Sequence, residues 1–302
     1  MICEIITWVY LVNDKIKVHI LHWGEIALHY WLKDFLRLFY ENKEQAWKLK
    51  HQFIPEKLYK YQPISEQRIN SLKENKLWFC KSTELNDPFD CQPTFFNEKE
   101  LLDEIIKTER PNKLTVSDED ILKWIKQLLL DFKSSVNVTC FSETPYNMPM
   151  WGNYANNHRG ICVEYDFNQL EYFNEFTKNM FPVGYEENRY DITNLLKRLL
   201  TRKYDPKLSL FFFLLMLKHN SWEYEREWRV LDMDIDEGLG LGKISGNGRL
   251  LDCPVQPSAI YFGMNCSDTD IEEISTFIDP KQTKLYKLNI GNHKYFNLDI
   301  IQ

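Results

Sequence analysis

The sequence predicts an α+β fold, a mixed, mainly antiparallel sheet core with helical insertions. Two observations carry this prediction. Many short runs of strand length alternate irregularly with segments of helical periodicity. Hydrophobic residues make up 44% of the 302 residues, which is enough for a sizeable core. The length fits one large domain, or one domain with an appendage.

Each expected element follows from a local pattern. Strands are expected where β-branched and aromatic residues cluster, at 57–61, 76–82, 136–142, 160–167, 180–186, 224–232, 258–264, 284–290 and 294–300. Helices are expected where apolar residues recur at helical spacing, at 65–75, 98–108, 117–133, 191–203, 206–220 and 267–278, with a short helix or turn at 148–158. Ser65 is the expected N-cap of the first helix.

Residues 1–54 form the first expected unit, and residues 55–302 form a single α+β domain of catalytic type. A hairpin turning at Asn13-Asp14 and a helix over 25–50 precede Pro55. We expect residues 1–50 to pack on the main domain or on a second copy, which would give a homodimer.

The composition excludes several function classes. A net charge of -7 argues against a sequence-independent DNA coat, although a locally basic groove would still accept nucleic acid. Seven cysteines without a C-x-x-C pair indicate reduced thiols and a cytoplasmic location. The most apolar run, 208–217, is too short to span a membrane. P-loop, dinucleotide-binding and metalloprotease motifs are missing, histidine spacings fit no common metal site, and the glycine-rich 238–248 is expected to be a mobile loop.

The segment WEYEREWRVL, residues 222–231, is the most informative one. Glu223, Glu225 and Glu227 stand two apart in an expected strand, so the last two carboxylates would share one face roughly 6–7 Å apart. Like charges this close need a cation, a hydrogen bond or a substrate. A solvated face paired with Arg226 and Arg229 is the simpler interpretation. The alternating aromatics instead indicate a half-buried strand, and therefore the wall of a site.

Three further segments carry polar and aromatic residues, and each also has a purely structural explanation. LYKY (58–61) could bind a ligand at a strand end or be half-buried packing. LNDPFD (85–90) could be a site loop or an Asx-type turn before Pro88. In MWGNYANNHRG (150–160), Trp151 and Tyr154 could be core residues at helical spacing, whereas His158 and Arg159 have more the character of site residues.

These blocks resemble a known family. LYKYQP, KLWFCKSTELNDPFD, CFSETPYNMPMWGNYANNHRGICVEYDF, WEYEREWRVL and AIYFGMNCS resemble the bacterial and phage-associated family catalogued as domain of unknown function 2971, over roughly residues 55–300. The resemblance implies kinship and no particular activity.

A second resemblance implies a function. The order of short strand, helix, strand and later Glu-x-Glu strand is similar to ADP-ribosyltransferase-fold enzymes, including toxins that modify nucleic acid. It implies NAD as substrate, Glu227 as the catalytic glutamate, Glu225 as the first member of Glu-x-Glu, and Tyr59, Lys60 and Tyr61 at the first-strand motif. This chain has neither the His nor the Arg usual on that strand, so Lys60 or Tyr61 would stand in, and it has no clear Ser-Thr-Ser strand.

The remaining roles follow from side-chain chemistry. Trp151 and Tyr154 could stack nicotinamide or adenine, and Arg159 or Arg229 could meet the pyrophosphate, with His158 beside them. We therefore expect an NAD-consuming enzyme, a toxin or anti-phage effector, whose acceptor is a protein, a nucleic acid or water.

Two alternatives stay open. One is a metal-dependent nuclease in which Asp87, Asp90, Glu225 and Glu227 bind Mg²⁺. The other is a non-catalytic module that binds a nucleotide or a partner.

Overall fold

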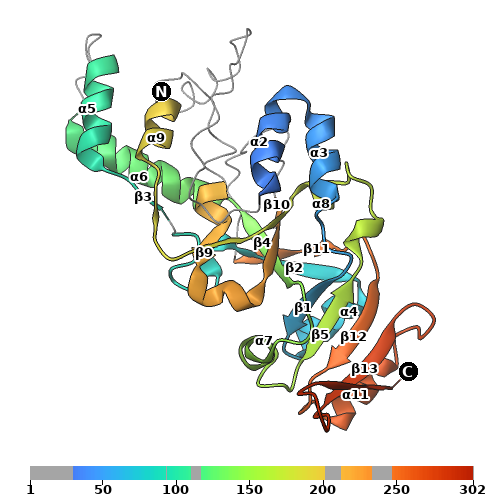
Figure 1. Ribbon diagram of the computed structural model, residues 1–302. Helices are drawn as coiled ribbons and strands as arrows, with labels where there is room; N and C mark the ends of the chain where they lie inside the picture. Colours follow the sequence, from blue (N-terminus) through green and yellow to red (C-terminus); the bar gives the residue numbers. More distant parts are fainter. Residues whose placement is uncertain (1–29, 93, 110–116, 201–211, 233–246, 302) are drawn as a thin grey trace.

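The computed structural model describes residues 30–92, 94–109, 117–200, 212–232 and 247–301. A ten-stranded mixed sheet forms its centre (Figure 1). Its strands are β1 (Leu58–Gln62), β2 (Lys76–Lys81), β4 (Asn137–Ser142), β5 (Ile161–Tyr165), β6 (Met180–Pro182), β10 (Glu227–Asp232), β11 (Gly248–Asp252), β12 (Pro257–Phe262), β13 (Lys284–Asn289) and β14 (Asn297–Ile300). All of its pairs are antiparallel except β12 with β13. The predicted α+β class with a mainly antiparallel sheet is confirmed.

The sheet branches at β4. The main path runs β11-β2-β4-β1-β5-β12-β13-β14, while β10 pairs with β4 and with β6. One edge of β4 pairs with β10 over its full length. The other edge pairs with β2 at Asn137 and Val138 and with β1 only at Ser142. Strands β1 and β2 therefore diverge, and the Lys60 ammonium donates to Thr139 Oγ1 (2.7 Å) and to the Cys140 carbonyl (3.1 Å) in the interval between them.

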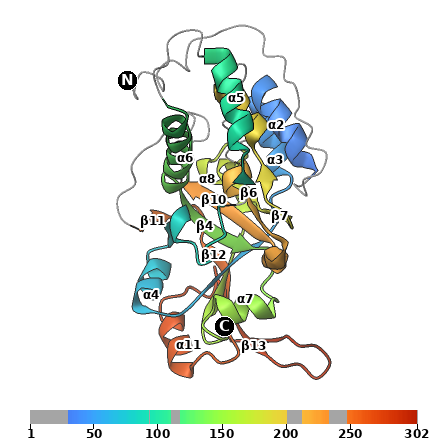
Figure 2. The same ribbon diagram turned by 90° about the vertical axis from the view of Figure 1, so that its left-hand side faces the viewer.

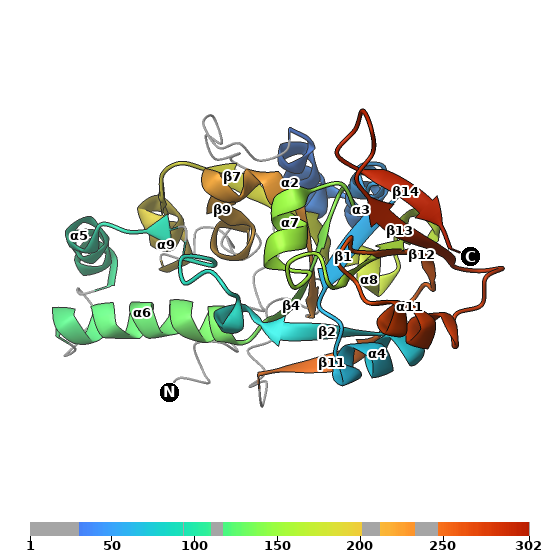
Figure 3. The same ribbon diagram turned by 90° about the horizontal axis from the view of Figure 1, so that it is seen from below.

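Helices surround the sheet. They are α2 (Trp31–Glu41), α3 (Lys43–His51), α4 (Glu66–Lys73), α5 (Glu98–Glu109), α6 (Asp118–Ser134), α7 (Met148–Asn153), α8 (Glu175–Lys178), α9 (Thr193–Leu200) and α11 (Asp268–Ser275). Helices α5, α6 and α9 gather at the end of the molecule opposite β13 and β14 (Figure 3). Helices α4 and α11 lie together at the lower left in Figure 2. Ser65 caps α4 as expected, accepting from the Arg68 amide.

Helices α2 and α3 share the main hydrophobic core. The chain breaks the expected 25–50 helix at Asn42, whose extended backbone and side-chain bond to the Gln45 amide start α3. Phe35 packs against Phe181 and Phe212 of the main domain. The buried Lys50 ammonium donates to the carbonyls of residues 177, 178 and 180. The predicted hairpin around Asn13 and the first residues of the predicted helix lie outside the described residues.

Two other element predictions are corrected. The expected strand 180–186 divides at Val183, whose amide donates to the Glu227 carbonyl, and the chain then forms β7 (Gly184–Glu186) beside β9 (Leu217–His219). Strand β9 also replaces the end of the helix expected over 206–220, of which 206–211 lie outside the described residues. A short parallel pair, β3 (Thr94–Phe95) with β8 (Tyr190–Asp191), completes the strands. Within the described ranges, no helix has the length and apolarity needed to cross a bilayer.

Candidate active site

Glu225 and Glu227 both pair with Lys218, although the backbone between them is not the expected strand. The predicted strand 224–232 begins only at Glu227, because residues 220–225 form a 3-10 helix, η5 (Asn220–Glu225). Arg226 follows in the left-handed region, with φ 43° and ψ 57°. The expectation that a strand places both glutamates on one face is therefore wrong. The turn nevertheless brings both carboxylates to the Lys218 ammonium, at 2.7 Å from Glu225 and 3.3 Å from Glu227.

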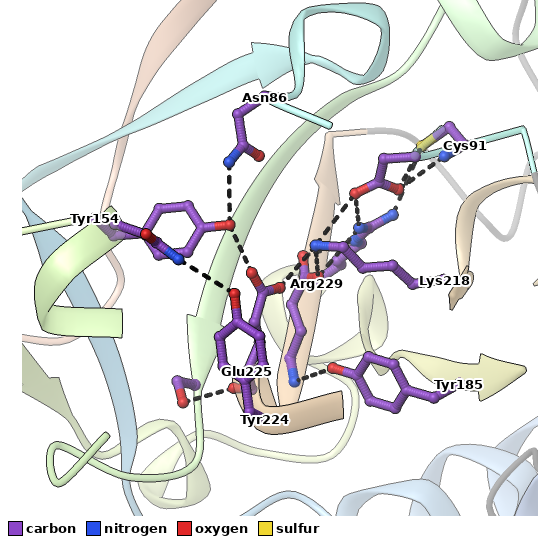
Figure 4. A network of polar contacts seen from close by, with 12 residues as sticks. Asn86, Cys91, Tyr154, Tyr185, Lys218, Tyr224, Glu225 and Arg229 are labelled. Atoms are coloured by element: carbon purple, nitrogen blue, oxygen red, sulfur yellow. Dashed lines mark hydrogen bonds and ion pairs between the residues drawn. The ribbon is translucent and has the colours of Figure 1, made fainter. Parts of the chain in front are cut away.

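Three carboxylates and two cations form a buried cluster around this point (Figure 4). Arg229 donates from Nε to Glu227 (2.7 Å) and from Nη2 to Asp90 (2.6 Å). Lys218 also lies 3.4 Å from Asp90. All five residues of the cluster are at most 5% exposed: Asp90, Lys218, Glu225, Glu227 and Arg229. Charges enclosed this far from water must be paired, and here each one is.

The two glutamates have pKa values shifted in opposite directions. Burial alone would raise the pKa of Glu227, but the charges of Arg229 and Lys218 outweigh burial and hold it well below its usual range. Burial and the charge of Glu227 raise the pKa of Glu225, against the opposing effect of Lys218. Glu227 is thus held ionised, while Glu225 is the carboxylate of the pair that more readily takes up a proton.

The depressed pKa of Glu227 makes a stability prediction. A carboxylate whose folded-state pKa lies below the ordinary value of 4.5 contributes stability above that pH, and this contribution is lost as the pH falls. The raised pKa of Glu225 acts in the opposite sense. We expect the free energy of unfolding in urea to fall more steeply for the wild type than for Glu227→Gln between about pH 5 and pH 3. Parallel curves would contradict the assignment.

Three sequence blocks that stood out for their polar residues meet at Glu225. The Asn86 amide donates to the Tyr154 hydroxyl (3.2 Å), which donates to Glu225 Oε1 (2.5 Å), as Figure 4 shows. Asn86 comes from the NDPF block, and Tyr154 follows α7. Ser142 Oγ, at the end of β4, donates to the Glu225 carbonyl (2.7 Å). The hydrogen-bond chain therefore leads from the exposed Asn86 through the half-buried Tyr154 to the buried cluster.

An open pocket of about 680 Å³ lies beside Glu227. Its wall combines aromatic rings with carboxylates and a single arginine, contributed by Glu143, Val183, Tyr185, Asn220, Ser221, Glu223, Tyr224, Arg226, Glu227 and Trp228. The Tyr185 hydroxyl accepts from the Glu227 amide (2.8 Å), and the Trp228 indole donates to Glu143 (2.9 Å). Three residues thus belong to both the pocket and the polar network: Tyr185, Tyr224 and Glu227.

The structure places the expected first-strand residues near the glutamates but not in contact with them. Tyr59 pairs with Ser142 on one side of β4, and Glu227 pairs with Ser142 on the other. Their backbones are thus two strand spacings apart, roughly 10 Å. Tyr61 is 8% exposed and donates its hydroxyl to the Thr144 carbonyl (2.8 Å).

Trp151 and Arg229 are enclosed by protein. The Trp151 indole donates to the Pro145 carbonyl (2.7 Å) and packs edge-to-face on Tyr61, so its ring is a core element rather than a stacking surface. The Arg229 guanidinium contacts Glu227, Asp90 and the Leu215 carbonyl. It therefore stabilises the cluster and is not turned toward an exposed pyrophosphate position.

His158 and Arg159 lie in a strained turn after α7. Asn156, Asn157 and His158 all have positive φ, between 47° and 64°. The His158 ring stacks on Trp151, and its Nδ1 has no hydrogen-bond partner within the described part of the chain. Arg159 is exposed, away from the buried cluster's direct contacts.

The four acidic residues of the metal-binding alternative, Asp87, Asp90, Glu225 and Glu227, are engaged in other contacts. Asp87 accepts from the Phe89 amide (2.9 Å), which is the turn role open to it from the sequence. The carboxylates of Asp90, Glu225 and Glu227 are already paired with Lys218 and Arg229. Among the residues that the structure describes, no group of three or more His, Cys, Asp or Glu side chains is arranged to hold a metal ion.

Sequence reasoning did not single out Lys218 or Tyr185. Lys218 directly follows the apolar run FFFLLML, and a lysine that must be buried with such a run needs a carboxylate partner. That signal could have found it. Tyr185 contributes through its bond to the backbone amide of Glu227, which is distant in the sequence, so no local pattern indicates it.

The comparisons with known proteins bear on this site. Residues 150–230 match the model of a family described as protein of unknown function (DUF2971), so the resemblance seen in the sequence blocks is confirmed there. The matched segment contains Tyr154, Lys218, Glu225, Glu227 and Arg229, whereas Asn86 and Asp90 precede it. No curated protein and no solved structure matches the chain.

Proposed function

We propose that the protein is an NAD-consuming enzyme of the ADP-ribosyltransferase type. One observation carries the proposal: Glu225 and Glu227 meet at Lys218 beside a pocket that Glu227 helps to line and that holds three aromatic rings. The opposite pKa shifts of the two glutamates support a division of roles between them.

The chemistry of the pocket suits the nicotinamide end of NAD. The nicotinamide ring is planar and positively charged while it is attached to ribose. Tyr185, Tyr224 and Trp228 offer ring faces or edges, and Glu143 and Glu223 add negative charge at the wall. Arg226 is exposed at the same wall and could meet a phosphate. A volume of about 680 Å³ lies within the usual size of a small-molecule site.

The two carboxylates would act at different steps. The bond between nicotinamide and ribose C1′ breaks, and its electron pair leaves with nicotinamide. Glu227, held ionised, stabilises the positive charge that develops on the ribose. The oxygen or nitrogen of the acceptor then bonds to C1′ and gives up one proton, for which Glu225 is the nearby base with the higher pKa.

The test uses NAD labelled separately in its nicotinamide and its adenine. Purified protein is incubated with each form, alone and with bacterial lysate. We expect release of free nicotinamide and, with lysate, adenine label attached to a macromolecule. Growth arrest on expression in a bacterial host would extend the proposal to a toxin or anti-phage effector.

Other results would select the alternatives. Binding of NAD without any nicotinamide release would indicate a non-catalytic nucleotide-binding module. Degradation of RNA or DNA that needs Mg²⁺ and no NAD would indicate a nuclease. Either result contradicts the proposed activity.

A further inference from the structure

We propose that Tyr154 is the residue that meets the acceptor, and that its hydroxyl relays the acceptor's proton to Glu225. This inference rests on the proposed function and adds to it the residue that makes acceptor contact. It follows from access, from hydrogen-bond direction and from the way α7 is held.

Tyr154 and Glu225 differ in how accessible they are to an acceptor. Glu225 is 3% exposed, and both of its carboxylate oxygens are engaged, Oε1 by the Tyr154 hydroxyl and Oε2 by Lys218. An acceptor therefore has no direct approach to the carboxylate. Tyr154 is only half-buried and stands on the outer side of Glu225. A proton that ends on Glu225 must pass through this hydroxyl.

The direction of the hydrogen bonds suits a relay. The Asn86 Nδ2 group that contacts Tyr154 can only donate, so the Tyr154 oxygen accepts from it and directs its own proton to Glu225 Oε1 at 2.5 Å. As the acceptor bonds to ribose, its proton moves to the Tyr154 oxygen while the tyrosine proton moves to Glu225. The tyrosine ends neutral, Glu225 ends protonated, and no other reactant is needed. Burial and the charge of Glu225 raise the pKa of Tyr154, which keeps the phenol protonated between turnovers.

The backbone around Tyr154 is fixed to the glutamate segment. Asn147 caps α7 through the Met150 amide, and its own amide group donates to the Tyr224 carbonyl, next to Glu225. Asn153 donates to the Tyr224 hydroxyl (3.2 Å), so the neighbouring tyrosine is engaged elsewhere. Two hydrogen bonds from the ends of α7 to Tyr224, the residue before Glu225, thus hold α7 against η5.

The test compares Tyr154→Phe with the wild type in the labelled-NAD reaction with an acceptor. We expect kcat for acceptor modification to fall about 10²-fold, with KM for NAD unchanged, because a positioned proton-transfer group typically supplies 10²–10⁴-fold. Tyr172→Phe is the matched control, since it removes another tyrosine hydroxyl bonded to a glutamate, Glu44, on the α3 side of the molecule. The control should keep the wild-type kcat.

A double variant distinguishes a relay from a structural contact. If Tyr154 and Glu225 act as one unit, Tyr154→Phe combined with Glu225→Gln should be no slower than the slower single variant. Multiplying effects would overturn the relay. If Tyr154→Phe does not fold, the dependence of the wild-type kcat on the D₂O fraction of the solvent replaces that variant. A relay predicts that two transferred protons contribute to this dependence, and a contribution from one proton alone would overturn it. A wild type that leaves NAD intact refutes the proposed function, whereas an active wild type with an unimpaired, folded Tyr154→Phe refutes only the relay.

Discussion

Replacing Glu227 with glutamine is expected to lower the rate of nicotinamide release about 10³-fold, the scale seen when one preorganised electrostatic group is lost from a transition-state site. Glutamine keeps the shape of the side chain but removes the negative charge that would face the developing ribose cation. The measurement is single-turnover release of nicotinamide at saturating NAD, with circular dichroism to confirm the fold.

The matched control for this variant is Glu119→Gln on α6. Glu119 is an exposed glutamate that pairs with Lys123 on the helix surface, so its charge has no role in the cluster. It should release nicotinamide at the wild-type rate. A folded Glu227→Gln protein with normal NAD turnover would eliminate Glu227 as the catalytic glutamate.

Replacing Arg229 with methionine is expected to reduce the free energy of unfolding by about 3–5 kcal/mol, the usual consequence of removing one partner from a buried ionic network. The guanidinium is fully buried between Glu227 and Asp90, and its loss leaves three enclosed carboxylates with Lys218 as their cation in the described cluster. Urea unfolding at neutral pH gives the value directly.

Arg249→Met supplies the comparison for that experiment. Arg249 pairs with Asp232 at the end of β10, but its side chain is 56% exposed. An exposed pair contributes little, so we expect a change below about 1 kcal/mol. If the two variants lose equal stability, burial of the Arg229 cluster is not what makes it important.

The sequence predicted most of the fold because most elements have local causes. The strands at 58–62 and 137–142 follow from clustered β-branched and aromatic residues, and the helices after Ser65 and Ser117 begin at side-chain caps. The branching of the sheet at β4 was beyond such reasoning, because it depends on which distant strands share one partner.

The site was predicted less completely, for a similar reason. The importance of the Glu225–Glu227 segment could be seen, since acidic residues alternate with aromatics there. The left-handed backbone of Arg226, which ends η5, could not be predicted. A non-glycine residue with positive φ gives no local sequence signal. Lys218 and Asp90 reach the cluster from other parts of the chain. Only the tertiary fold shows which carboxylates Lys218 pairs with, and that Asp90 is a third carboxylate there.

The three-way pairing of β4 has a consequence for how this chain can change. Cys80, Tyr59 and Glu227 all take their alignment from this single strand, through Val138 and Ser142. Inserting one residue within 138–142 would turn the following side chains to the opposite face. Length variation in relatives should therefore accumulate in the connecting segments and spare these positions.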